Sequence, residues 1–174
     1  MSDTNNSEQL IIDGLFDLMI ETPYTEISVK SICEKSGVSR MTFYRHFHTK
    51  EDVVIEQIAQ VFRTFVDSVA TDKSITFDQL ASTFFNIIKD HKDMLMIILN
   101  NDLSNLLLRQ LKNYMTMLVN DKILELRENS SKLLIALISG GLTEILIVWA
   151  EDDMQIPVEE LVIFAMKYMH FKIN

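Results

Sequence analysis

The side chains with the clearest chemistry in this sequence lie close together between residues 39 and 47. If this run is helical, Phe43 and Phe47 lie four residues apart on one side of the helix, where they can pack inward. The opposite side then carries cationic and hydrogen-bonding side chains, namely Arg40, Thr42, Tyr44, Arg45 and His46. A guanidinium group can donate two parallel hydrogen bonds to O6 and N7 of guanine, and hydroxyl groups suit phosphate oxygens. The run therefore carries the donors that recognition of DNA requires.

The residues before this run predict the element that would hold it. Val29, Ile32 and Cys33 follow the i, i+3, i+4 spacing of an amphipathic helix. Gly37 follows where a left-handed residue would end that helix, and Ser39 is suited to cap the next one. Two short helices joined by a glycine turn are typical of a helix-turn-helix, whose second helix enters the major groove of DNA.

The charge of the chain is unevenly distributed. Between residues 28 and 50 one anion, Glu34, stands against five cations, Lys30, Lys35, Arg40, Arg45 and Lys50. This local balance of +4 within a net charge of −9 leaves −13 for the rest of the chain. A basic patch on an acidic body attracts phosphates to one face. The cations could instead only solubilise the surface, but the helix-turn-helix spacing around them favours DNA.

The rest of the 174-residue chain predicts helices throughout. Only 4 glycines and 2 prolines, with 48% apolar residues, disfavour turn-rich β architecture, and the apolar residues recur at three- and four-residue spacings. Residues 1–7 are expected to form a disordered polar arm. Ser28, Thr49 and Pro157 are expected at helix starts, with Asp52 completing a capping box after Thr49. Apart from the helix-turn-helix, the predicted helices span residues 8–21, 50–69, 77–89, 93–100, 103–127, 130–150 and 158–171.

Cysteine usage and hydropathy indicate the compartment. The single cysteine, Cys33, excludes an intrachain disulfide and suits a small buried hydrophobe. The N-terminus has no basic run before an apolar segment, and no window approaches ~18 consecutive apolar residues. We therefore expect a cytoplasmic protein without a membrane partner.

The segment from Leu133 to Ala150 is apolar nearly all round and has a small-residue notch at residues 139–141. Such a helix must be covered on more than one side. It can be a central core helix within one chain, or it can pack with the last helix against their symmetry mates as the four-helix bundle of a homodimer. The homodimer is favoured, because a palindromic operator with two-fold symmetry needs a two-fold protein.

Two parts of the chain resemble a known family. Residues 28–39, 43–47 and 49–52 resemble the N-terminal DNA-binding domain of TetR-type (tetracycline-repressor-like) transcriptional regulators. Residues 139–161 are similar to the C-terminal domain of a group of these regulators common in Gram-positive bacteria, in which these helices form the dimer interface. The resemblance implies an all-α protein with a three-helix helix-turn-helix DNA-binding domain, residues 1–50, and a helical effector-binding and dimerisation domain, residues 51–174. It implies a sequence-specific repressor that a small-molecule effector releases from DNA.

The resemblance also assigns roles to single residues. Ser28 and Lys50, at the starts of the helices before and after the reading helix, would hold phosphates, and helix N-termini favour anions. Arg45 and His46 occupy variable positions that tune base preference. Tyr44 could also pack partly against the domain, His46 could simply be solvated, and Arg40 could contact phosphate instead of a base. The predicted DNA-contacting set is Ser28, Ser39, Arg40, Thr42, Tyr44, Arg45, His46 and Lys50.

The family resemblance implies an effector site in the C-terminal domain. Methionine and aromatic side chains there can line an apolar cavity, and His91 and Tyr114 could anchor a polar group. The predicted effector-binding residues are His91, Met94, Tyr114, Met117 and Trp149. Methionine and aromatic side chains at helical spacing more often form ordinary core.

Catalysis is not expected. Cys33 and the four histidines lack metal-ligand spacing, and the sequence has no Gly-rich phosphate loop or nucleophile motif. We therefore predict no enzyme activity, no metal and no cofactor. The alternative function is that of a TetR-like co-activator that binds a partner protein, against which Tyr44, Arg45 and Lys50 favour DNA contact.

Overall fold

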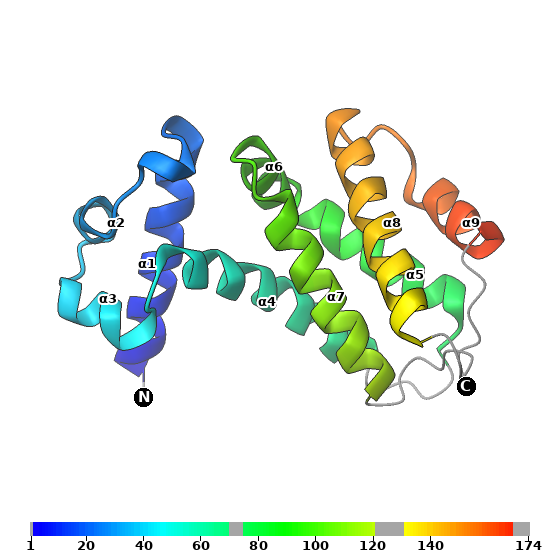
Figure 1. The fold of residues 1–174 in the computed structure, drawn as a ribbon, viewed down its shortest axis with the longest axis horizontal. Coiled ribbons are helices and arrows are strands. Elements are labelled where there is room, and N and C mark those ends of the chain that lie inside the picture. Colours follow the sequence, from blue (N-terminus) through cyan, green and yellow to red (C-terminus); the bar gives the residue numbers. More distant parts are fainter. Residues whose placement is uncertain (1, 70–74, 121–130, 169–174) are drawn as a thin grey trace.

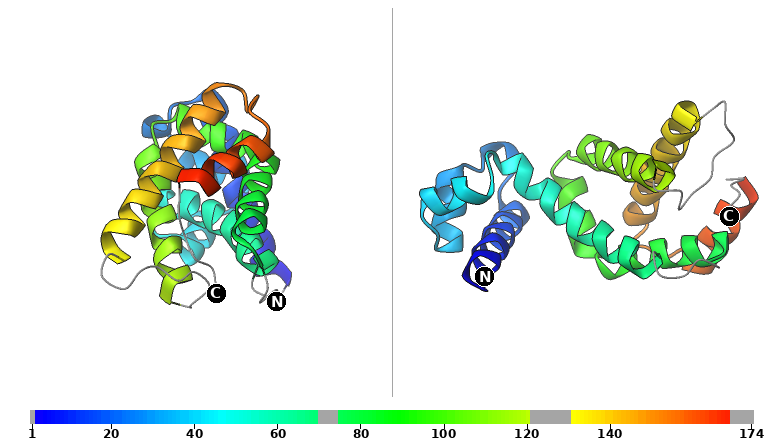
Figure 2. Two further views of the ribbon diagram at one scale, coloured as in Figure 1. Left: turned by 90° about the vertical axis from the view of Figure 1, so that its right-hand side faces the viewer. Right: turned by 90° about the horizontal axis from the view of Figure 1, so that it is seen from below.

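The computed structural model describes residues 2–69, 75–120 and 131–168, and the regular elements within these ranges are all helical (Figure 1). A head is built from α1 (Ser2–Glu21), the short 3-10 helix η1 (Tyr24–Glu26), α2 (Val29–Ser36) and α3 (Arg40–His46). Helix α4 (Lys50–Val69) runs from the head into a body, as the view from below shows (Figure 2). The body contains α5 (Phe77–Asp90), α6 (Lys92–Asn100), α7 (Ser104–Asn120), α8 (Ser131–Glu151) and α9 (Val158–Tyr168). The predicted all-α fold is confirmed.

The local signals that delimit the head are all present. Gly37 has the left-handed φ of 71° that ends α2, which a residue with a side chain adopts only at a cost. Ser39 caps α3 by accepting a hydrogen bond from Thr42 N–H at 3.0 Å. Asp52 Oδ2 accepts from Thr49 N–H at 2.8 Å, and Asp52 N–H donates to Thr49 Oγ1 at 3.2 Å. The predicted caps of α3 and α4 are therefore confirmed.

The N-terminus corrects one prediction. Helix α1 begins at Ser2, so the disordered arm expected over residues 1–7 is wrong for the described part of that stretch. No glycine or proline precedes Gly14, and each residue added to an existing helix gains one backbone hydrogen bond. The helical ends predicted over residues 121–127, at residue 130 and over residues 169–171 lie outside the described residues.

Apolar side chains from every helix of the head form its core. Ile11, Leu15, Ile32 and Phe43 are fully buried, and the start of α4 adds Val53 and Val54 to the same core. Helix α1 approaches α2 closely at Gly14, where a Cβ atom would lie 3.0 Å from Ser36 Cβ. Burial against α1 and α4 thus fixes α2 and α3 within the head, and it sets the orientation of α3.

Aromatic side chains organise the body. Phe62 and Phe65 of α4 pack against Phe84 of α5, so the helix that leaves the head also enters the core of the body. Trp149 of α8 is fully buried, and its Nε1–H donates to the carbonyl of Ile156 at 2.9 Å. The same helix, α4, is therefore part of both cores.

Helix α8 is the most apolar element of the fold. By length and composition alone it would also suit a membrane span, and it is the one helix of the described ranges that does. Ile138 and Leu146 are buried in the body, and α8 packs against α7. Leu133 and Leu137, however, are 79% and 71% exposed. α8 therefore combines a core side with an apolar side that the described residues leave uncovered.

Candidate nucleic-acid interface

Helix α3 has one buried and one exposed side, as its spacing predicts. Phe43 and Phe47 are buried. Arg40, Tyr44 and Arg45 are exposed, although the Tyr44 ring also packs edge-on against Phe43 with centroids 5.4 Å apart. The predicted outward position of these three residues is confirmed, and Tyr44 is steadied by its neighbour in the core.

Met41 belongs to the same exposed face and is absent from the predicted set. It is 83% exposed, more than any other large hydrophobic residue in the described chain. Positions 40, 41, 44 and 45 recur at i, i+1, i+4 and i+5, so Met41 lies between Arg40 and Arg45 on one helical face. An apolar side chain on a reading helix can contact the methyl group of thymine. The helical spacing alone could have identified it.

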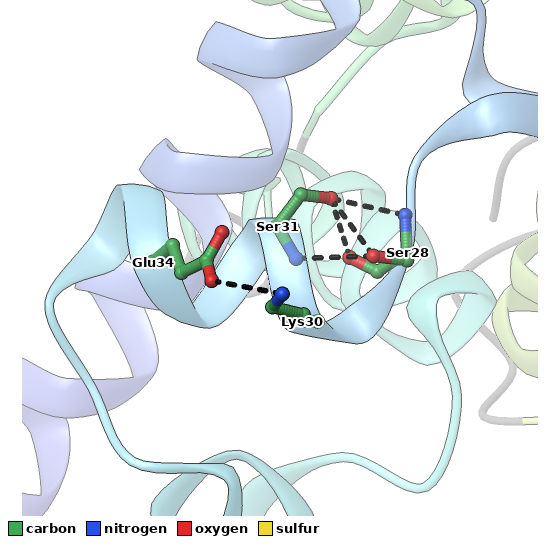
Figure 3. A network of polar contacts seen from close by, with 4 residues as sticks. All are labelled: Ser28, Lys30, Ser31 and Glu34. Atoms are coloured by element: carbon green, nitrogen blue, oxygen red, sulfur yellow. Dashed lines mark hydrogen bonds and ion pairs between the residues drawn. The ribbon is translucent and has the colours of Figure 1, made fainter.

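The hydroxyl groups of the predicted phosphate contacts are engaged in capping. Ser28 and Ser31 form a reciprocal capping box at the start of α2, with N–H to Oγ distances of 3.1 and 3.0 Å (Figure 3). At the start of α3, Ser39 Oγ accepts from Thr42 N–H, and the two hydroxyl oxygens lie 3.0 Å apart. A serine hydroxyl that accepts one hydrogen bond still has a proton to donate. The caps therefore leave phosphate contacts chemically feasible.

His46 departs from the prediction that it lies on the outer face. Its side chain is only 6% exposed, and Nδ1 lies 3.5 Å from Glu8 Oε2 of α1. Nε2 is buried and has no hydrogen-bond partner in the described part of the chain. Position 46 follows Phe43 by three residues and so shares its inward side. The predicted outward position of His46 is therefore wrong, and the side chain links α3 to α1.

Lys50 also has partners within the protein. Its Nζ donates to the carbonyl of Ile27 at 2.7 Å and to that of Tyr24, and it lies 4.3 Å from the centroid of the Tyr24 ring. Burial lowers the pKa of Lys50. The ammonium group thus fastens the start of α4 to the loop between α1 and α2. Its predicted contact with phosphate stays a prediction, and it would have to coexist with these bonds.

The body contains an apolar cavity of about 70 Å³, bounded by α4, α5, α7, α8 and α9. Of the five predicted effector-binding residues, only Tyr114 lines it, with its ring stacked on Phe62 at a centroid distance of 4.0 Å. Burial raises the pKa of Tyr114. The other four lie elsewhere: Trp149 in the core, His91 between α5 and α6, and Met94 and Met117 partly buried outside the cavity lining. In an apolar body, sequence spacing cannot distinguish a cavity wall from ordinary core.

A short exposed helix with guanidinium, phenol and thioether groups, held behind a glycine turn on a three-helix head, defines a helix-turn-helix DNA-binding regulator. Residues 11–56 match the family model described as bacterial regulatory proteins, tetR family. Residues 76–171, more than half of the chain, match the model described as transcriptional regulator C-terminal region, TetR_C_8. The chain belongs to the TetR family of transcriptional regulators.

Solved structures share the fold across nearly the whole chain. Lin0861 from Listeria innocua is 16% identical, with a TM-score of 0.82 over 95% of this chain and 90% of that chain. The fatty acid degradation regulator FadR from Bacillus halodurans is 23% identical, with a TM-score of 0.62 over 92% and 93%. FadR from Thermus thermophilus, a TetR family repressor in complex with lauroyl-CoA, is 16% identical, with a TM-score of 0.54 over 92% and 91%. No curated protein matches the chain by sequence.

The contacts of Lys50 lead to a prediction about stability. Lys50→Met keeps the length of the side chain but leaves part-buried carbonyls without their donor, which should lower the free energy of unfolding by about 1–3 kcal/mol. Thermal unfolding of the wild-type protein and of the Lys50→Met variant measures this difference in the free energy of unfolding. Lys30→Met is the matched control, since Lys30 is exposed and pairs only with Glu34 at 3.6 Å. An unchanged melting temperature for Lys50→Met, with a flatter salt dependence of DNA binding, would contradict this assignment and favour a phosphate contact.

Proposed function

We propose that the chain is a sequence-specific repressor that binds a palindromic operator in double-stranded DNA as a homodimer and releases it when a small-molecule effector binds. Sequence-specific DNA binding is supported above all by the exposed face of α3, which presents Arg40, Met41, Tyr44 and Arg45. Residues 1–50 would act as the DNA-binding domain and residues 51–174 as the effector-binding and dimerisation domain. We infer regulation, not catalysis, as the activity and the cytoplasm as its compartment.

The first experiment is selection from a random duplex DNA library by the purified protein at near-physiological salt. A dimer should enrich a palindrome with half-sites about one helical turn apart, because its two α3 helices enter successive major grooves. Arg45→Ala should relax the preference at one base pair per half-site by about 1–3 kcal/mol. Met41→Ala should weaken a preference for thymine in the same half-site.

A control for this experiment lies on α2. Lys35 pairs with Asp17 at 3.3 Å and is not on the exposed face of α3, so Lys35→Ala should leave the selected sequence unchanged. Failure to enrich any sequence, with only salt-labile binding, would count against sequence reading by this chain. That result would instead favour the alternative, a co-activator that binds a partner protein.

The homodimer is supported by apolar side chains that remain exposed within residues 2–69, 75–120 and 131–168. On α8, Leu133, Leu137 and Val148 are 79%, 71% and 51% exposed, and intervals of 4 and 11 residues put them on one helical face. On α9, Ile163 and Phe164 are 64% and 48% exposed. Both helices belong to the half of the body away from the head (Figure 1). A second copy of the same two helices would cover these residues as a four-helix bundle.

A charge in this surface should separate the two copies. Leu137→Glu would bury an unpaired carboxylate in the dimer, so sedimentation should detect monomers, and affinity for the palindrome should fall while affinity for one half-site is kept. Leu10→Glu is the control, because Leu10 is 42% exposed on α1, far along the chain from α8. A Leu137→Glu protein that remains dimeric would contradict this interface.

The effector is supported by the cavity. A volume of about 70 Å³ is well below that of ordinary ligand pockets, about 300–1,000 Å³, so the helices around it would have to part to admit a ligand. Its lining is wholly apolar, and Tyr114 contributes its ring to it. This lining suits an apolar chain. The lauroyl-CoA bound by the related FadR makes an acyl chain the first probe.

Laurate and lauroyl-CoA should raise the melting temperature and release the operator, as ligands that favour a different arrangement of the body. Ala81 lines the cavity, so Ala81→Met should fill it and abolish this response. Asn86→Met is the matched control, since Asn86 is exposed on the same helix. A response that persists in Ala81→Met would contradict the cavity as the site, and the absence of any response to both probes would contradict an acyl-chain effector.

A further inference from the structure

One of the side chains that connect the body to the head is that of Asn101. Asn101, directly after α6, donates from Nδ2 to the carbonyls of Met19 at 3.1 Å and Ile97 at 2.9 Å. Its Oδ1 accepts a hydrogen bond from Tyr24 N–H at 2.7 Å. Met19 and Tyr24 belong to the head, at sequence separations of 82 and 77 residues, whereas Ile97 belongs to α6. The amide therefore uses both donors and its acceptor at the boundary between the two parts.

The groups that Asn101 binds are those that a helix end leaves without partners. Met19 and Ile97 lie in the last turns of α1 and α6, where the carbonyls have no N–H ahead of them in the helix. One amide thus satisfies both helix ends and fixes the distance between them. Because α1 forms the core of the head with α2 and α3, a fixed end of α1 also fixes the direction of α3.

The loop that receives Asn101 leads directly to the reading unit. Tyr24 begins η1, and the carbonyls of Tyr24, Thr25 and Ile27 accept from Lys50 Nζ. Ser28, two residues after η1, caps α2. The loop between α1 and α2 is therefore bonded to the body through Asn101 and to α4 through Lys50, and it ends at the helix-turn-helix.

On the other side, Asn101 is connected to the cavity. Helix α5 carries Leu80, Ala81 and Phe84 of the cavity wall, and only His91 separates its end from the start of α6. Helix α6 is anchored in the core by Leu95 and Ile98, and Asn101 follows its last residue. A movement of α5 would thus reach Asn101 along one short helix that is anchored in the core at two positions.

A second contact between the head and the body is an exposed ion pair. Arg109 of α7 pairs with Glu51 of α4 at 2.7 Å, and the two side chains are 61% and 50% exposed. Exposed ion pairs contribute little and are screened by salt. The part-buried bonds of Asn101 are not screened in this way, so they constrain the position of the head more than the exposed ion pair does.

We infer that Asn101 is the positioning residue that sets the orientation of the reading head on the body, and hence the separation of the two reading helices in the dimer. This inference rests on the proposed dimeric reading of DNA. No atom of Asn101 belongs to the exposed face of α3, so its removal should change which operator spacing is bound and not which bases are preferred.

The test compares palindromes that differ only in half-site spacing. The wild-type protein should prefer the selected spacing over one that is lengthened or shortened by one base pair, and Asn101→Ala should reduce that preference by about tenfold, since it removes three hydrogen bonds. Affinity for an isolated half-site and the salt dependence of binding should stay unchanged. Asn101→Asp, which keeps the acceptor for Tyr24 N–H but sets a carboxylate oxygen against the carbonyls of Met19 and Ile97, should reduce the preference at least as much.

Two matched variants complete the test. Asn100→Ala alters an exposed neighbour on the same helix and should keep the wild-type preference, as should Arg109→Gln. A folded Asn101→Ala protein with an unchanged spacing preference would overturn the inference, and if that variant does not fold, Asn101→Asp decides in the same way. The inference would also be overturned if Arg109→Gln relaxed the spacing preference and Asn101→Ala did not. A wild-type protein that selects no palindrome would instead overturn the proposed function.

Discussion

The reading helix α3 is too short to be stable by itself, and the arrangement of the rest of the molecule depends on the contacts that stabilise it. Helix α3 has seven residues, whereas isolated helices need about 12–15 residues to be even marginally stable in water. Burial of Phe43 and Phe47 supplies the stabilising free energy that the few backbone hydrogen bonds of α3 cannot supply. Ser39 caps the start of α3, and Gly37 forms the turn before it. Because burial fixes one side of α3, the other side is presented to solvent in a defined orientation.

The same principle operates at the boundary between the head and the body. Three chain segments meet at the loop between α1 and α2, and Lys50 and Asn101 satisfy backbone groups there that regular structure leaves unpaired. Loops lack an internal ladder of hydrogen bonds, so side chains from elsewhere must supply the partners. In this protein those partners come from α4 and from the end of α6. The loop is therefore ordered by α4 and by the end of α6, so its conformation depends on how these two elements are placed relative to each other.

What the sequence predicts follows from the range of each interaction. Ser28, Gly37, Ser39, Thr49 and Asp52 act on residues within four positions, so their roles can be derived from spacing, and the helix-turn-helix follows from them. His46, Lys50 and Asn101 act on residues distant in sequence, and their contacts need the assembled fold. Four of the five predicted effector-binding residues lie outside the cavity lining for a related reason, because an apolar residue next to a cavity has the same neighbours in sequence as one in solid core. Met41 is the exception, since helical spacing alone assigns it to the exposed face.

The division of α3 into a buried and an exposed side has a consequence for how such a regulator diverges. Arg40, Met41 and Arg45 are exposed and contribute nothing to the core, so substitutions at these positions leave the folding free energy almost unchanged. Most mutations are lost because they push a protein below its stability threshold, and these three positions are largely free of that penalty. After a gene duplication, a copy could therefore acquire a new operator through a few changes at these positions while its fold is inherited intact.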